Sequence, residues 1–200
     1  MSELSLPGRL PRALRRLARE EDGGILVETA FVMPILLTLL LGSVEVGRYI
    51  IVNQKLERAA SSVADLVAQS NDTVSLEEIQ TLFGIVPHIV SPYDIVDNGR
   101  VIITAVTRGD DESDEPVVAW QIDGLGTLDG VSSVIGGVGD TANLPDGFVL
   151  PTGETIIVGE AWYDYDAYFF ESIDPTGPMY HRAYYRPRLA SLSQTPESEE

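Results

Sequence analysis

The sequence predicts an α+β protein: one long N-terminal helix, with a membrane-spanning half and an exposed half, packed on a small antiparallel β-sheet. Three observations support this prediction. Apolar and charged residues are segregated along the chain, an apolar run near the N-terminus continues into a segment with helical spacing, and the C-terminal half carries β-branched runs separated by loops.

The charge and composition already exclude several classes of protein. The chain has 200 residues, a net charge of −18 and no cysteine, yet its mean hydropathy is +0.06. Disulfides, thiolate zinc sites and iron–sulfur clusters are therefore excluded, and nucleic acid is not expected as a partner because the acidic chain would repel phosphates. Residues 1–58 hold eight basic and seven acidic side chains, so the remaining residues carry −19.

The apolar residues are concentrated between Gly23 and Val44, a stretch that contains one charged residue, Glu28. A helix needs about 20 apolar residues to cross the ~30 Å hydrocarbon core of a bilayer. A helix buried in a soluble domain would show more polar residues at helical spacing. We therefore expect residues 24–46 to form a transmembrane helix that contacts the lipid bilayer.

The flanking charges predict the orientation of this helix. Five arginines precede the apolar run, and the positive-inside rule keeps such a segment in the cytoplasm while the acidic C-terminal head is exported. These residues are Arg9, Arg12, Arg15, Arg16 and Arg19. The end of the run, LLLGSVEVG, lacks the small-x-small pattern of a secretory signal, so cleavage there is not expected.

Glu28 allows two interpretations from the residues alone. A carboxylate inside a spanning helix costs about 2.5–3.5 kcal/mol, so it either reaches back to the interface or has a functional partner. The preceding residues, EEDGG-ILV-E, resemble the signal of type IV prepilins. That resemblance implies cleavage after Gly23 by a prepilin peptidase, a new N-terminus at Gly24, and Glu28 at the fifth mature position. There it would pair with the amine of a neighbouring subunit.

A wider resemblance covers most of the chain. The residues GGILVETAFVMPILLTLLLGSVEVGR are similar to the start of the TadE/TadG-like pseudopilin family, with Pro34 inside the apolar run and a Glu-x-Gly-Arg pattern at Glu45–Arg48. The ending YHRAYYRPRLA is also similar to the close of TadE-like proteins. The short head favours TadE among the related types.

The resemblance implies a pilin-like fold and a minor pseudopilin of a Tad, or Flp, adhesive pilus. It further implies a cleaved cytoplasmic leader at residues 1–23 and, as partners, other Tad pilins or pseudopilins and the inner-membrane assembly machinery. The protein would lie in the inner membrane of a Gram-negative bacterium, with a periplasmic or extracellular head. The alternative is an uncleaved, single-pass, membrane-anchored envelope protein whose acidic head binds a ligand or another protein.

The head is predicted to occupy residues 47–190. The first helix should continue to about residue 69, because Val52, Leu56, Ala59, Val63 and Leu66 recur at helical spacing. A capping box, Ser75 to Glu78, predicts a second helix that ends near Pro87. Strands are expected at 100–107, 116–122, 154–169 and 179–186. The Gly/Pro-rich segment at 123–153 is expected to be a long, mobile loop or an insertion, and residues 191–200 a disordered tail.

The strand at 154–169 shows an alternation typical of a sheet with one solvated face. Its small and apolar residues, Ile157 to Tyr165, alternate with Glu160, Asp164 and Asp166. The first two strands flank the acidic segment 108–115, which predicts a hairpin with a solvated loop.

No catalytic or metal-binding constellation is evident, so an enzyme is not expected, and neither a metal nor a cofactor is predicted. His88 and His181 lie outside metal-ligand and catalytic motifs. The acidic segment lacks the spacing of a calcium loop. The aromatic residues between Trp162 and Phe170 could suggest sugar binding, but their strand spacing favours core and sheet surface.

Overall fold

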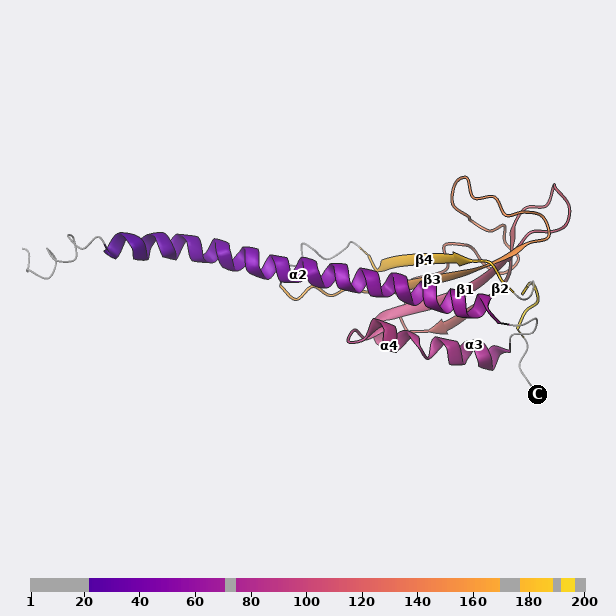
Figure 1. Cartoon of the computed structure of the whole chain (residues 1–200), viewed down its shortest axis with the longest axis horizontal. Coiled ribbons are helices and arrows are strands. Elements are labelled where there is room, and N and C mark those ends of the chain that lie inside the picture. Colours follow the sequence, from indigo (N-terminus) through magenta and orange to yellow (C-terminus); the bar gives the residue numbers. More distant parts are fainter. Residues whose placement is uncertain (1–21, 71–74, 170–176, 189–191, 197–200) are drawn as a thin grey trace, which may run out of the picture. The chain divides into compact units, whose positions relative to one another are not determined.

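The computed structural model describes residues 22–70, 75–169, 177–188 and 192–196. The five arginines of the predicted leader lie outside the described residues. The chain divides into two compact units, Met1–Val44 and Glu45–Glu200. The second unit therefore begins two residues before the predicted head boundary at residue 47. Figure 1 shows the elements in chain order.

The helix α2, Asp22–Ala68, confirms the predicted long N-terminal helix. Within the first unit its large apolar side chains are exposed, and none of its most apolar window is buried. Pro34 lies inside the helix and has no amide to donate, while the Thr38 hydroxyl donates to the Pro34 carbonyl at 2.8 Å. A core helix of a soluble domain would be covered, so this surface is consistent with a single-pass membrane protein.

The part of α2 that belongs to the second unit is the spine of the head. Val52, Leu56, Ala59 and Val63 are fully buried, as the helical spacing predicted. Leu66 is only half-buried, and Val67 takes the buried position in the last turn. The same helix thus changes from a mainly apolar surface to an amphipathic one along its length.

Three short helices follow α2 within the described residues. In α3, Leu76–Phe83, the Ser75 hydroxyl accepts a hydrogen bond from the Glu78 amide at 3.2 Å, as the capping box predicted. The expected continuation to Pro87 is wrong, because α3 ends at Phe83 and a separate helix, α4, Val86–Val90, follows. Pro87 lies in the first turn of α4, where its missing amide costs nothing. A helix that the sequence did not predict, α5, Ile95–Asn98, is capped by Asp94.

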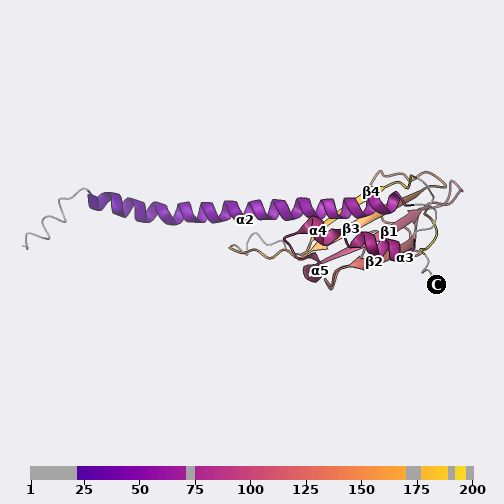
Figure 2. The ribbon, with the colours of Figure 1, turned by 60° about the horizontal axis from the view of Figure 1, so that its bottom comes forward.

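In the part of the chain that the structure describes, four antiparallel strands form one sheet in the order β2-β1-β3-β4. Figure 2 shows this sheet with the short helices. The strands are β1, Gly99–Thr107; β2, Val117–Leu125; β3, Thr155–Tyr163; and β4, Met179–Tyr185. The predicted hairpin of the first two strands is confirmed. Together with α2, the sheet confirms the predicted α+β fold with a pilin-like arrangement. The third strand ends at Tyr163, well before the predicted residue 169.

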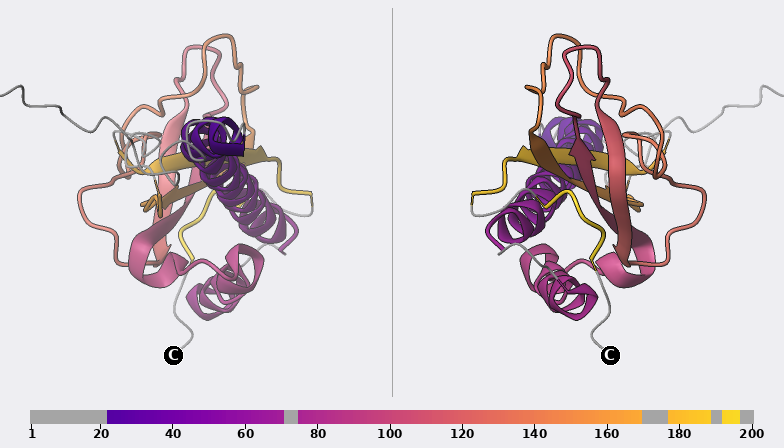
Figure 3. Two further views of the ribbon diagram at one scale, coloured as in Figure 1. Left: turned by 90° about the vertical axis from the view of Figure 1, so that its left-hand side faces the viewer. Right: turned by 90° about the vertical axis from the view of Figure 1, so that its right-hand side faces the viewer.

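One face of the sheet packs on α2 and the short helices. Gly159 of β3 allows close approach, since a Cβ there would lie 2.4 Å from the Ala60 carbonyl oxygen. Two hydrogen bonds join β4 to the same helix, Ser61 to Tyr185 at 2.6 Å and Asn53 to His181 at 2.9 Å. The end-on views of Figure 3 show the helices beside this face.

The other face of the sheet is covered, which corrects the predicted one-sided alternation. All nine residues of β3 are buried, including Glu160. The cover is the segment that the sequence predicted to be a mobile loop, which places Ile135 and Leu150 in a cluster with Ile156 and Val158. Glu160 of β3 faces this loop rather than water. The alternation of polar and apolar residues therefore predicted the wrong environment for this side chain.

Part of the predicted disordered tail is also packed. Leu192 is buried, and its carbonyl accepts a hydrogen bond from the Trp120 indole at 2.8 Å. Residues 197–200 of this tail lie outside the described residues.

We predict that Gly159→Ala destabilises the head by about 1–3 kcal/mol, since overpacking against a backbone forces elements apart. The added Cβ would also lie 2.9 Å from the Ala64 Cβ, so α2 would have to shift away from β3. The thermal midpoint of the full-length protein in detergent, followed by circular dichroism, should fall. The control is Gly177→Ala, where a Cβ meets nothing within 4 Å. Equal midpoints for the two variants would contradict this packing.

Candidate functional site

The predicted processing and assembly residues lie at the start of α2. Gly23, Gly24 and Glu28 fall in its first two turns, and Glu28 is exposed among exposed apolar neighbours. Ile25 and Leu26 are 64% and 72% exposed. Within the described residues Glu28 has no ion-pair partner. Its neighbours on the helix are exposed and mostly apolar.

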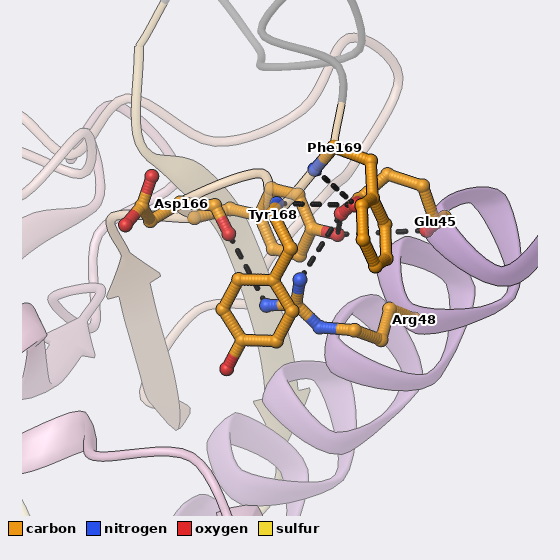
Figure 4. Close-up of polar contacts among 6 residues, drawn as sticks. Glu45, Arg48, Asp166, Tyr168 and Phe169 are labelled. Atoms are coloured by element: carbon orange, nitrogen blue, oxygen red, sulfur yellow. Dashed lines mark hydrogen bonds and ion pairs between the residues drawn. The ribbon is translucent and has the colours of Figure 1, made fainter. Parts of the chain in front are cut away.

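The most elaborate polar cluster in the structure is built around Glu45, the first residue of the second unit (Figure 4). Its carboxylate is fully buried and accepts four hydrogen bonds. Oε1 accepts from the Tyr165 hydroxyl and from Arg48 Nη1 at 3.1 Å. Oε2 accepts from the backbone amides of Tyr168 at 3.0 Å and Phe169 at 3.1 Å. A carboxylate has about four acceptor positions, so this one is saturated.

Arg48 joins the same loop from one turn further along α2. Its Nη2 donates to the Asp166 carbonyl at 3.1 Å, and its Cζ lies 3.3 Å from the centroid of the Tyr168 ring. The Tyr165 ring is 5.1 Å from the same carbon. A guanidinium over aromatic faces gains a cation–π attraction in addition to its ion pair. We call Glu45, Arg48, Tyr165, Tyr168 and Phe169 the Glu45 cluster.

The cluster favours one distribution of charge. The Arg48 guanidinium and the two backbone amides that donate to Glu45 favour its ionised form. Burial, together with the hydrogen bond to Glu45, raises the pKa of Tyr165. The stable arrangement is therefore a carboxylate and a neutral phenol.

The local sequence explains only half of this cluster. Glu45 and Arg48 are three residues apart on a helix, so their side chains are neighbours. Their partners follow β3, where the chain leaves the sheet after Tyr163 and the Asp164 amide donates to the Asn98 carbonyl at 2.7 Å. The sequence singled out the Glu-x-Gly-Arg pattern but could not supply its partners, which lie about 120 residues away.

The chemistry of this cluster is that of a structural clamp. Every acceptor position of Glu45 is occupied by the protein itself, so the carboxylate is not free to transfer a proton or hold a metal. No group of three potential metal ligands occurs among the described residues. The cluster fixes the loop after β3 against α2 at the residue where the second unit begins.

A second buried carboxylate, Glu160, performs a similar task on the far side of the sheet. It accepts hydrogen bonds from the Ser133 hydroxyl, from the Val134 amide at 2.9 Å and from the Tyr180 hydroxyl at 2.7 Å. Burial, together with the hydrogen bond to Glu160, raises the pKa of Tyr180. Glu160 thus attaches the covering loop to β3 and β4.

The remaining candidates are dispersed. His88 is exposed, whereas His181 faces α2 and burial lowers its pKa. The acidic segment after β1 forms a largely exposed loop, as predicted. Trp162 and Tyr165 are 4% and 2% exposed, which places them in the core.

Residues 23–65 match the family model described as TadE-like protein. The match starts at Gly23 and contains Glu28 and the Glu45–Arg48 pattern, and it confirms the predicted resemblance to the TadE-like family. This family suggests a structural component associated with a Tad pilus. No curated protein and no solved structure matches the chain.

We predict that Glu45→Gln destabilises the head by about 1.5–3 kcal/mol at neutral pH, the usual contribution of hydrogen bonds to a charged group. The neutral amide of the variant keeps the shape of the side chain but cannot accept all four hydrogen bonds or pair with Arg48. Urea titrations of the wild type and the variant at neutral pH measure the difference in unfolding free energy.

The control for this experiment is Glu57→Gln, an exposed carboxylate on the same helix. This variant should keep the unfolding free energy of the wild type within about 0.5 kcal/mol, as is usual for an exposed position. Equal unfolding free energies for the wild type and Glu45→Gln would contradict the role of the ionised carboxylate.

Proposed function

We propose that this chain is a TadE-like minor pseudopilin, a structural and assembly component of a Tad, or Flp, adhesive pilus rather than an enzyme. The observation that supports this most directly is the position of the family match, which begins at Gly23, the residue after which a prepilin peptidase would cut. The exposed apolar surface of α2 up to Val44 supports the same proposal, because such a surface requires a bilayer or a filament core.

Cleavage after Gly23 has a defined electrostatic consequence. It leaves Glu28 four residues from a free α-ammonium at Gly24, one helical turn into an apolar surface. A carboxylate in that environment gains from a cationic partner, and the amine of a neighbouring subunit supplies one. The five leader arginines hold the N-terminus in the cytoplasm beforehand, which leaves the acidic head on the periplasmic or outer side of the inner membrane.

The partners of this proposal are a prepilin peptidase, other Tad pilins or pseudopilins, and the inner-membrane assembly machinery of a Gram-negative bacterium. The competing proposal is an uncleaved single-pass protein whose head binds a ligand or another envelope protein. The saturated Glu45 cluster and the core on both faces of the sheet support it, because a head with its own core can bind a partner without joining a filament. The two proposals differ at one peptide bond.

We predict that the mature protein begins at Gly24 only in cells with a prepilin peptidase. Intact-mass spectrometry of the purified chain from cells with and without the peptidase measures this. Gly23→Leu should keep the chain uncleaved, because the bulky residue replaces the expected scissile glycine, whereas the matched variant Gly24→Ala should still be processed. A start at Met1 in both strains would contradict cleavage and favour the anchored binding protein.

We predict that Glu28→Ala is still inserted and cleaved but loses co-purification with pilus components by roughly tenfold or more, as expected when a desolvated charge pair worth ~1.4 kcal/mol or more is lost. Insertion should not suffer, since the substitution removes a charge from the span. The matched control is Glu57→Ala, on the exposed surface of α2 in the second unit. Co-purification of Glu28→Ala at the wild-type level would rule out the assembly role.

A further inference from the structure

Two aromatic side chains of the Glu45 cluster point away from the core. Tyr168 and Phe169 are 69% and 49% exposed, although their backbone amides are both bonded to Glu45. Tyr165, three residues earlier, is 2% exposed. The loop is thus held by its backbone while it presents large apolar rings outward, which is unfavourable in water.

The chain position of Glu45 fixes the level of these rings relative to the apolar segment. Residues 24–44 would extend about 31 Å along a helix, close to the ~30 Å hydrocarbon core. Glu45 directly follows Val44 and is the next charged residue after Glu28, so it would stand where the chain leaves the hydrocarbon. The amides of Tyr168 and Phe169 are within hydrogen-bond distance of its carboxylate, whatever the orientation of the head about that point.

The side chains at this level have the chemistry of a membrane interface. Tyr and other aromatic residues concentrate in the headgroup layer, where the ring contacts acyl chains and a polar group stays hydrated. Val46, 45% exposed, adds an apolar side chain next to Glu45. The Arg48 guanidinium, over the Tyr168 ring, brings a cation to the level of the lipid phosphates. The Glu45 carboxylate at this level is already paired with Arg48 and saturated by its four hydrogen bonds, and the other nearby carboxylate belongs to the exposed residue Asp166, whose carbonyl accepts from Arg48.

We infer that Val46, Tyr168 and Phe169, which we call the membrane-proximal patch, lie in the lipid headgroup layer of the bilayer that holds residues 24–44. The patch attaches the base of the head to the membrane surface, and the Glu45 cluster couples that attachment to the fold. This inference rests on the proposed membrane anchoring and is independent of cleavage after Gly23.

The absence of cysteine from the sequence allows a direct test with single labelled positions. Full-length Phe169→Cys, which retains the backbone amide bonded to Glu45, is labelled with a fluorophore and reconstituted in vesicles of phosphatidylethanolamine and phosphatidylglycerol. Quenching by aqueous iodide is compared with Val149→Cys, 75% exposed on the covering loop, and with Leu36→Cys, 59% exposed in the apolar segment. We expect quenching at position 169 to be roughly threefold or more below that at position 149, because the headgroup layer excludes the ion.

The outcomes separate the two proposals. Shielding at position 36 together with full quenching at position 169 would overturn the inference and leave membrane anchoring intact. Full quenching at position 36 would overturn membrane anchoring, and the inference with it. Nanodiscs that hold one chain each distinguish shielding by lipid from shielding by a second copy of the chain. Shielding at position 169 that persists in these nanodiscs supports the lipid contact. Shielding that occurs only in vesicles crowded with protein would overturn the lipid contact.

Discussion

The buried carboxylate of Glu45 is the interaction on which the organisation of this protein depends. A charge with no solvent exposure is stable only when its acceptor positions are filled, and here two backbone amides, a phenol and a guanidinium fill them. Because these donors come from a loop far along the chain, satisfying this one side chain determines where the C-terminal half of the head attaches to α2. It does so at the first charged residue after the apolar run that ends at Val44.

A second constraint acts on the sheet, which has to be covered on both faces. The helices cover one face, and close approach at Gly159 lets α2 lie directly against β3. The other face relies on an irregular loop rich in glycine, whose few apolar residues, Ile135 and Leu150, complete a small second core. Glu160 repeats the principle of Glu45: a buried carboxylate collects hydroxyl and amide donors from a loop and so fixes an otherwise irregular segment.

These two clamps account for the main differences between expectation and structure. Alternation along residues 154–169 indicated a strand with a solvated face, yet the strand stops at Tyr163 and both faces are buried. Of the polar residues that suggested solvent contact, Glu160 is buried under the covering loop, whereas Asp164 and Asp166 are exposed in the loop that bonds to Glu45. The polarity of Glu160 reports a need for hydrogen-bond partners, and there the protein supplies them in place of water.

The sequence alone determined the elements whose signals are local. The apolar run predicts an exposed apolar helix, helical spacing predicts the buried seam through Val52 and Leu56, and Ser75 marks the start of α3. β-Branched runs predict the four strands. All of these elements can be predicted because periodicity and helix capping depend on residues only a few positions apart. Only the tertiary structure decided which two strands are central, what covers the second face of the sheet, and which groups surround Glu45. Those features depend on donors and acceptors separated by up to about 120 residues, and no local pattern specifies which distant partner will satisfy a buried charge.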